Sequence, residues 1–334
     1  MHLINGFNKE QAAGQRLMVG FEGRRFNPDL RRLIADFKVG GVILFAGNIA
    51  VPEQLKTLCR DIQAFARHCG QPPLFIAVDQ EGGPVARLKH PFSEFAGNAA
   101  MADEKEAADF ADITAGELRS VGINMNMAPV LDVAPSGVDS VMAQRSFGSD
   151  PQWVARMGGV VVETLQRGRI MSVAKHFPGI GKTSLDSHLD QPVLNVAADE
   201  LKASDLVPFQ AAFEKNVAGI MLSHIRYSAL DEHWPASLSR RIADDFLRRR
   251  MGYEGVVLTD DLDMGAVTKH YSVETVVDRI CRARVDIALI CHKGPAIAAA
   301  FAAFKNHLQT DPAAAAAGRR SLDRIMALKR AYLD

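Results

Sequence analysis

Residues 175–188 combine the kinds of side chain that a catalytic site needs. The segment reads Lys-His-Phe-Pro-Gly-Ile-Gly-Lys-Thr-Ser-Leu-Asp-Ser-His, so Lys175 and His176 precede a glycine-rich loop and Asp186 and His188 follow it. A segment that only stabilises a fold has no need of two imidazoles, a cation and a carboxylate around such a loop. A site that binds a polar ligand and moves a proton does need them. The segment therefore predicts a functional site.

Metal-assisted hydrolysis is one chemistry that these residue types suit. Imidazole and carboxylate groups bind zinc or manganese, and the ligands would come from His176, Asp186, His188, Asp190 and His224. However, Asp-x-His-x-Asp on a loop is not an established ligand spacing, and no His-x-x-x-His pair lies nearby. We therefore expect no metal and no cofactor.

Glycoside hydrolysis is the second chemistry that fits. It requires a nucleophilic carboxylate below the anomeric carbon and a proton donor beside the leaving oxygen. Asp260, which ends an apolar run, suits the first role. The Asp186–His188 pair suits the second role, because the carboxylate can orient and charge the imidazole.

The rest of the chain alternates between short apolar runs and amphipathic stretches. The apolar runs, which we expect to be strands, cover 16–20, 41–45, 74–78, 123–132, 171–176, 219–225, 255–260 and 286–291. The amphipathic stretches, which we expect to be helices, cover 27–37, 52–69, 103–121, 151–168, 200–216, 239–251, 273–284 and 295–308. Continuous apolar runs are typical of parallel strands that are buried on both faces.

Eight such units without a break in composition favour one closed barrel. We therefore predict an α/β fold in which residues 1–334 form a single catalytic domain, a (β/α)₈ TIM-type barrel with some irregular strands. The Ala-rich stretch from Asp311 to Asp334 is predicted to be a C-terminal helix packed outside the barrel. A doubly wound open sheet is the alternative, but no Gly-x-Gly-x-x-Gly follows the first strand.

Ionisable residues collect where the predicted strands end. One such residue alone is better explained as a strand-end cap, but their agreement over six strands favours a site at the carboxyl ends, which form the catalytic face of barrels. The residues, in strand order from the third to the eighth, are Asp79, Asp132, Lys175 with His176, His224, Asp260 with Asp261, and His292.

Composition and charge exclude several classes of function. The 334 residues include 39 basic and 39 acidic ones, so there is no electrostatic case for binding nucleic acid or an anionic membrane. The four cysteines form no Cys-x-x-Cys pair, which favours free thiols in a reducing compartment. No apolar run approaches the roughly 18 residues of a membrane span, and the first residues lack the pattern of a signal peptide. We expect a cytoplasmic monomer without nucleic-acid or membrane partners.

Several motifs together resemble one enzyme family. Lys-His-Phe-Pro-Gly-x-Gly at 175–181, followed by Asp-Ser-His at 186–188, is similar to the signature of the β-N-acetylglucosaminidases of glycoside hydrolase family 3. The resemblance extends in the family's order over nearly the whole chain. It includes Met-Val-Gly-Phe at 18–21, Asp-Gln-Glu-Gly-Gly at 79–83, Ala-Pro-Val-Leu-Asp at 128–132, Arg-Ser-Phe-Gly at 145–148 and Thr-Asp-Asp-Leu-Asp-Met at 259–264.

The resemblance implies a role for each matching position. Asp260 would be the nucleophile that forms a covalent glycosyl-enzyme, and His188, held by Asp186, would be the general acid/base. The substrate-binding positions would be Asp79, which grips sugar hydroxyls, together with Arg87, Arg145, Lys175 and His176. The implied activity is that of a retaining exo-enzyme that removes non-reducing-end N-acetylglucosamine from cell-wall muropeptides during recycling, or from related glycans.

Three positions depart from the family pattern, and two other activities stay open. Ile180 replaces a histidine in the loop, Pro84 replaces an arginine, and Arg284 replaces a glycine before the last strand. A β-glucosidase or a phosphorylase of the wider family is the alternative, since an uncharged histidine donor would not repel phosphate. A non-enzymatic carbohydrate-binding barrel would be expected to lack Asp260 or the dyad, and both are present.

The loop that carries the dyad is predicted to act as a lid. Residues 179–187 contain two glycines, a serine and a threonine and little apolar content. Loops of this kind lie at the low-stability end of a fold. We expect the loop to be mobile or displaced without substrate, with His188 too far from Asp260 for catalysis, and Ile180 to seek an apolar contact.

Overall fold

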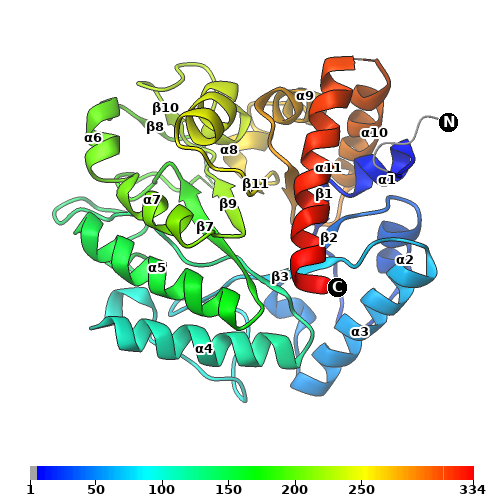
Figure 1. Cartoon of the computed structure of the whole chain (residues 1–334), viewed down its shortest axis with the longest axis horizontal. Helices are drawn as coiled ribbons and strands as arrows, with labels where there is room; N and C mark the ends of the chain where they lie inside the picture. Colours follow the sequence, from blue (N-terminus) through cyan, green and yellow to red (C-terminus); the bar gives the residue numbers. More distant parts are fainter. Residues whose placement is uncertain (1–5, 188, 311) are drawn as a thin grey trace.

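Eight parallel strands close into a barrel in the order β1-β12-β11-β9-β7-β6-β3-β2 (Figure 1). The computed structural model describes residues 6–187, 189–310 and 312–334. The strands are buried along their length except for the last two residues of β11. The barrel strands are β1 (Leu17–Val19), β2 (Gly41–Leu44), β3 (Phe75–Val78), β6 (Met125–Asn126), β7 (Met171–Phe177), β9 (Gly219–Leu222), β11 (Val256–Asp261) and β12 (Ile287–Ile290). The predicted (β/α)₈ barrel is confirmed.

Helices surround the ring of strands and join one strand to the next. The α-helices are α1 (Lys9–Gly14), α2 (Pro28–Ala35), α3 (Pro52–His68), α4 (Glu104–Ser120), α5 (Pro151–Arg167), α6 (Ala198–Ala203), α7 (Val207–Glu214), α8 (Gly265–Thr268), α9 (Val273–Ala283), α10 (Pro295–Thr310) and α11 (Pro312–Leu333). Three short 3₁₀ turns are η1 (Ala46–Asn48), η2 (Asn98–Ala100) and η3 (Ala236–Leu238), and a π-helical segment is η4 (Arg241–Arg250).

Local sequence signals start several of these helices. Asn27, Asp103 and Ser272 each accept a hydrogen bond from a backbone N–H of the first turn of α2, α4 and α9. These short polar side chains satisfy N–H groups that have no partner inside the helix. Proline occupies the start of α2 and α5, where its missing N–H costs nothing.

Two predicted elements are interrupted at prolines. The strand expected over 123–132 is reduced to β6 and one isolated bridge between Val130 and Lys175, because Pro129 has no N–H to give to the sheet. The helix expected over 200–216 is divided into α6 and α7, and Pro208 lies in the first turn of the second piece. Both differences follow from the fixed ring and the missing donor of proline.

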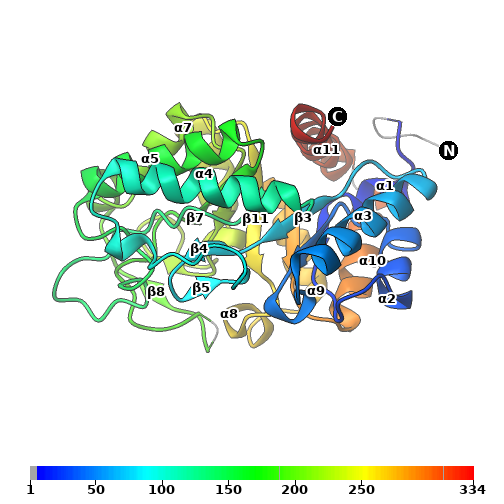
Figure 2. The same cartoon turned by 90° about the horizontal axis from the view of Figure 1, so that it is seen from below.

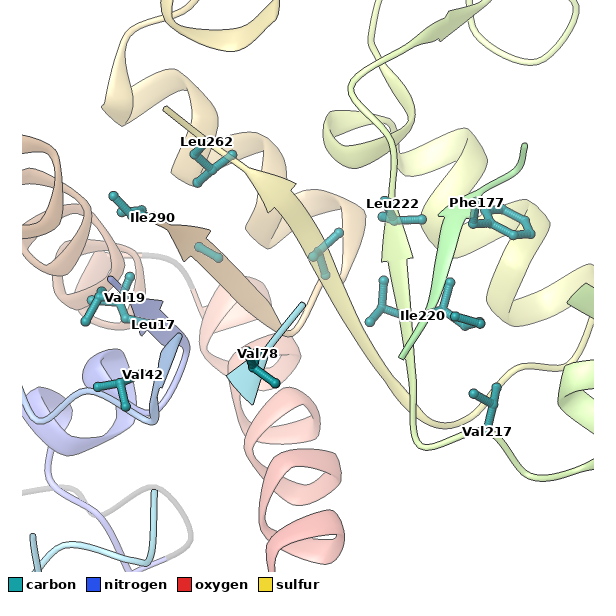
Figure 3. Packing of buried hydrophobic residues seen from close by; sticks show 14 of the residues in the cluster. Leu17, Val19, Val42, Val78, Phe177, Val217, Ile220, Leu222, Leu262 and Ile290 are labelled. Carbon is teal, nitrogen blue, oxygen red and sulfur yellow. The ribbon is translucent and has the colours of Figure 1, made fainter. Parts of the chain in front are cut away.

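Apolar side chains fill two layers. The inner layer fills the barrel and is rich in methionine, including Met18, Met125, Met171 and Met221. The outer layer lies between strands and helices, and Figure 3 shows part of it, with Val19, Ile220 and Ile290 on three different strands. The strands are therefore buried on both faces, as their continuous apolar sequences predicted.

Helix α11 is the expected C-terminal helix, and it packs against the barrel by closing its amino-terminal end. Ile325 is fully buried in the inner layer with Met18 and Phe75. Lys329 Nζ donates to the carbonyl oxygen of Gly40, directly before β2. Figures 1 and 2 show α11 across one end of the barrel, with β4, β5 and α8 on the opposite side.

Two small sheets lie outside the barrel and were not predicted. One pairs β4 (Gln80–Gly82) with β5 (Val85–Ala86), and the other pairs β8 (Val193–Leu194) with β10 (Arg226–Tyr227). The four cysteines are free. Within the described residues, no helix has the length and apolar character that crossing a membrane requires.

Candidate active site

Five adjacent strands bring the predicted site residues to the carboxyl end of the barrel. Going round the ring, β11, β9, β7, β6 and β3 are consecutive neighbours. At or just beyond their ends lie Asp260, His224, Lys175 with His176, Asp132 and Asp79. Residues that are up to 181 positions apart in the sequence, from Asp79 to Asp260, thus share one arc of the face.

A buried network of charges occupies one side of this arc. Lys175 Nζ lies 2.7 Å from Asp79 Oδ1 and 2.5 Å from Glu81 Oε1. Arg145 forms a two-pronged pair with Glu81, at 2.9 and 2.8 Å. Arg87 approaches Asp79 at 3.5 Å and lies over the ring of Phe45. The structure thus joins four of the five predicted substrate-binding side chains into one network, and Glu81, which was not predicted, connects Arg145 to it.

The network keeps its members ionised. Burial alone would raise the pKa values of Asp79 and Glu81, but the neighbouring Lys175, with Arg87 or Arg145, holds both below their ordinary values. Burial opposes the charge of Lys175, yet Asp79 and Glu81 raise its pKa overall. A buried charge without such partners would cost several kcal/mol. The site therefore holds fixed charges in place before any ligand arrives.

Asp132 fixes the fifth predicted binding residue, His176. The Nδ1 of His176 lies 2.7 Å from Asp132 Oδ2, so Nδ1–H donates to the carboxylate and Nε2 is left for other contacts. The other oxygen, Oδ1, accepts from the backbone N–H groups of His176 and Ile180. Asp132 is fully buried, and its role is to orient the imidazole and the start of the loop.

Asp260 lies where cationic and polar groups surround it. Burial disfavours its charge, but His176, the Asp261 N–H and Lys175 together lower its pKa below the ordinary value. Its Oδ1 accepts the Asp261 N–H at 2.8 Å. An ionised carboxylate at the end of a barrel strand is what a nucleophile at an anomeric carbon requires.

His224 supports the segment around Asp260 and is not available as a metal ligand. Its Nε2 donates to the backbone carbonyl of Asp261 at 2.9 Å, and its Nδ1 lies 2.7 Å from the Ser237 hydroxyl. A carbonyl can only accept, so the proton is on Nε2 and Nδ1 accepts from Ser237. Burial lowers the pKa of His224, which favours this neutral form.

Asp261 faces away from Asp260, toward β12. Its Oδ1 accepts the N–H groups of Asp263 and Cys291, both at 3.0 Å. Burial and the nearby carboxylates raise its pKa to about 6. In the described part of the chain, one group of three or more histidine, cysteine, aspartate or glutamate side chains could hold a metal ion. It consists of Asp261, Asp263 and His292, whose ligand atoms all lie within 4.8 Å of one another. Both carboxylates already accept backbone N–H groups, and His292 is mostly exposed.

The dyad is described only in part. Asp186 is exposed, and its carbonyl oxygen accepts the Leu189 N–H at 2.9 Å. His188 lies outside the described residues, so its distance to Asp260 and the predicted lid stay predictions. The other proposed metal ligand, Asp190, pairs with His270 at 2.7 Å.

The first part of the loop is anchored, contrary to its expected lack of apolar contacts. Ile180 is only 5% exposed and packs in the outer layer of the core, as expected of an isoleucine in that position. Gly181 lies so close to the Val133 carbonyl that any side chain would collide with it. Lys182 pairs with Asp205 at 2.6 Å. Exposure begins at Ser184, so only the later residues can act as a lid.

The sequence of this chain is similar to those of known glycoside hydrolases. Residues 9–327 match the glycosyl hydrolase family 3 N terminal domain. The chain is 36% identical over 292 residues to a β-hexosaminidase of Alkalilimnicola ehrlichii, covering 85% of this chain and 82% of the relative. It is 34% identical to a β-hexosaminidase of Methylococcus capsulatus, covering 92% and 93%.

A solved structure is similar along almost the whole chain. It is a glycoside hydrolase family 3 β-N-acetylglucosaminidase from Paenibacillus sp., with a TM-score of 0.92 and 35% identity, covering 97% of this chain and 62% of that longer chain. The barrel, the charged face and these matches define a glycoside hydrolase. The chain belongs to glycoside hydrolase family 3, as its motifs indicated.

Proposed function

We propose that this enzyme is a retaining exo-β-N-acetylglucosaminidase that acts through a covalent glycosyl-enzyme. The observation that carries the proposal is Asp260, an ionised carboxylate at the end of β11, beside His176 and His224. The names of the relatives, β-hexosaminidase and β-N-acetylglucosaminidase, support the choice of sugar.

The reaction takes two displacements. Asp260 attacks the anomeric carbon while the bond to the aglycone oxygen breaks, and His188 gives its proton to that oxygen. A water molecule then attacks the same carbon, His188 removes a proton from it, and Asp260 leaves as a carboxylate. Asp186 orients the imidazole and stabilises its charged form.

The charged network holds the non-reducing sugar. Asp79 accepts hydrogen bonds from sugar hydroxyls, while Lys175, Arg87 and Arg145 donate to sugar oxygens. Because these groups are already fixed by one another, binding loses little side-chain entropy. The Nε2 of His176 remains for the sugar because Asp132 holds Nδ1.

The biological setting is a further part of the proposal. Family resemblance favours cell-wall muropeptides or related glycans as substrates and one catalytic barrel acting as a monomer. The four free cysteines fit the reducing cytoplasm. An even balance of 39 basic and 39 acidic residues gives no reason to add a nucleic-acid or membrane partner.

The test is to label the nucleophile and to follow the product. A 5-fluoro N-acetylglucosamine analogue should label Asp260, and Asp260→Asn should lose roughly 10³-fold or more in turnover. Asp261→Asn is the matched control and should keep turnover within about tenfold, because its side chain faces β12. Proton NMR of the first product should show the β-anomer from a β-substrate.

Three results would contradict the proposal. Label on Asp261 or Asp263 would move the nucleophile, and an initial α-anomer would mean direct attack by water. A glycosyl phosphate formed only in phosphate buffer would identify a phosphorylase. Faster release of glucose than of N-acetylglucosamine from matched aryl glycosides would identify a β-glucosidase.

A further inference from the structure

The segment that follows the nucleophile strand contacts the dyad loop on both sides of residue 188. The Ala266 N–H, in α8, donates to the carbonyl oxygen of Ser187 at 3.1 Å. The Ala266 carbonyl oxygen accepts from Gln191 Nε2, also at 3.1 Å. One residue of α8 thus uses both of its backbone groups to hold the loop, and α8 begins four residues after the nucleophile strand ends at Asp261.

Two side chains beyond α8 continue this contact. The Tyr271 hydroxyl exchanges hydrogen bonds with the side-chain amide of Gln191, at 3.2 and 3.4 Å. His270 Nε2 lies 2.7 Å from Asp190 Oδ1. Gln191 therefore sits between the backbone of Ala266 and the ring of Tyr271.

Tyr271 is held by packing that does not involve the loop. Its ring stacks on Trp234 with 5.3 Å between centroids, and the Arg279 guanidinium lies 4.1 Å from the centroid of Trp234. The ring of Tyr271 is therefore fixed independently of the loop, and the loop is the segment that can detach from it.

Burial does not hold the exposed part of the loop in place. Leu185 and Leu189 are 41% and 63% exposed, so burial of their side chains contributes little to holding the loop against α8. The loop's near end is fixed at Ile180 and Lys182. Between that anchor and Gln191, the described contacts to α8 and to residues 270–271 are polar.

We propose that Gln191 and Tyr271 are positioning residues that latch the dyad loop to α8 and so set where the proton donor stands relative to Asp260. The proposal rests on the proposed function, because it needs the donor to be carried by residues 186–188. Neither residue touches the sugar in this account. They act by keeping the donor in line with the leaving oxygen, and a displacement of about 1 Å costs much of such an effect.

The experiment compares Tyr271→Phe and Gln191→Ala with two matched controls. Tyr271→Phe removes one hydroxyl and keeps the ring on Trp234. The controls are Tyr332→Phe, on α11 at the other end of the barrel, and Gln152→Ala, exposed on α5. All are assayed on aryl N-acetyl-β-glucosaminides whose leaving groups range from dinitrophenol to an unactivated alcohol.

The expected result is a loss that depends on the leaving group. For the poorest leaving group, kcat/KM of both variants should fall roughly tenfold or more, whereas for dinitrophenol, which needs no proton, it should stay within about twofold. The Tyr271→Phe, Gln191→Ala double variant should lose little more than Gln191→Ala, since both remove one connection. The controls should match wild type throughout.

Hydrogen exchange gives a readout that does not depend on activity. The Ala266 amide is protected by its bond to the Ser187 carbonyl, so it should exchange faster in Gln191→Ala. The amide of Val267 bonds to Met264 within the same segment and should not change, which excludes general unfolding of α8.

The outcomes separate the latch from the proposed function. An unchanged Ala266 amide, or equal losses on all leaving groups, would overturn the latch while wild-type hydrolysis and Asp260 labelling stand. If wild type neither hydrolyses these glycosides nor labels at Asp260, the proposed function fails and the latch fails with it.

Discussion

Asp260 and Asp261 are neighbours in the chain and yet have opposite electrostatic surroundings. Successive side chains of a strand point to opposite sides, and here one meets imidazoles and a lysine while the other meets carboxylates. Interactions with neighbours lower the pKa of Asp260, and burial raises that of Asp261 to about 6. Only the first carboxylate is thus strongly favoured in its charged form.

Asp261 gives a stability prediction with a definite sign. Its pKa is about 6 in the folded state against an ordinary value of 3.8, so the folded state binds more protons between these values and stability falls as pH rises through them. Asp261→Asn keeps an acceptor oxygen for the two backbone N–H groups and removes the charge. It should be more stable than wild type by about 2–3 kcal/mol at pH 7.5.

Urea unfolding at two pH values checks this prediction. The gain should shrink to a small fraction near pH 4, where wild-type Asp261 is almost fully protonated in the folded state and partly protonated in the unfolded state. Asp112→Asn, an exposed change on α4, is the control and should show no such gain at pH 7.5. An equal gain from Asp261→Asn at both pH values would mean that the charge is not its source.

The dyad is tested by the dependence on the leaving group. If His188 donates the proton, His188→Ala should lose roughly 10²–10⁴-fold on unactivated glycosides and far less on dinitrophenyl glycosides. Asp186→Asn should show the same pattern in weaker form, since the imidazole remains but loses the carboxylate. Equal losses on both kinds of substrate would assign His188 to binding.

The sequence predicted the residues at the strand ends better than the partners that hold them. Asp79, Lys175 and Asp260 were found because each ends an apolar run. Glu81 and Asp132 were not assigned roles, because their partners Arg145 and His176 lie 64 and 44 residues away. A weak signal existed for Glu81, since residues two apart in an extended segment share a face with Asp79.

At the scale of elements, α9 ends in a residue that strains its own backbone. Arg284 caps the helix with φ of 56°, the left-handed region that glycine occupies at little cost. This accounts for the glycine expected at that position. Arg284 gains a 3.0 Å ion pair with Asp244 in return, although Arg249 also pairs with that carboxylate.

Replacing Arg284 should therefore stabilise the protein slightly. Arg284→Gly relieves about 1 kcal/mol of strain. It loses an ion pair to the buried Asp244, but that carboxylate keeps its pair with Arg249, so we expect a net gain of about 0.5 kcal/mol. Arg282→Gly, inside the same helix and also paired with an aspartate, should instead lose about 1 kcal/mol. Thermal unfolding of the two variants side by side measures both; a loss in Arg284→Gly would show that the ion pair outweighs the strain.

Helices and strands were predictable from the sequence where the apolar pattern is strong. They were less predictable where a single residue determines where an element ends. The β2, β3 and β12 runs begin and end within one residue of the predicted bounds. In contrast, Pro129 shortened β6, and the two-residue strands β5, β8 and β10 are too short to leave a pattern. The loop after Lys182 has no period at all, so its docking on α8 came only from the structure.

At the scale of the whole molecule, α11 buries a lysine at the amino-terminal end of the barrel. Lys329 is 1% exposed, and burial lowers its pKa to about 7 from 10.5. It donates to Gln15 Oε1 and the Gly40 carbonyl and lies 4.8 Å from the centroid of Phe75, but none of these groups carries a negative charge. The apolar spacing of α11 indicated a packed helix without indicating what it packs against.

Lys329 predicts a second dependence of stability on pH. Between pH 7 and 10.5 the unfolded state binds more protons, so this group makes stability rise with pH across that window. Lys329→Met removes the buried charge and should add on the order of 3–4 kcal/mol below pH 7, less as pH approaches 10. Lys305→Met, on α10 and more exposed, is the control. A constant difference across the window would contradict the assignment.

The pairing of β1 with β12 sets when the barrel can exist during synthesis. Leu17 aligns with Ala288 and Val19 with Ile290, so the ring has no closing partner until the last strand leaves the ribosome. At roughly 5–20 residues per second, β1 waits about 15–55 s with one edge unpaired. The unpaired edge is a template for other strands throughout that interval. A premature stop before β12 therefore yields an open sheet that tends to associate, and never a smaller working enzyme.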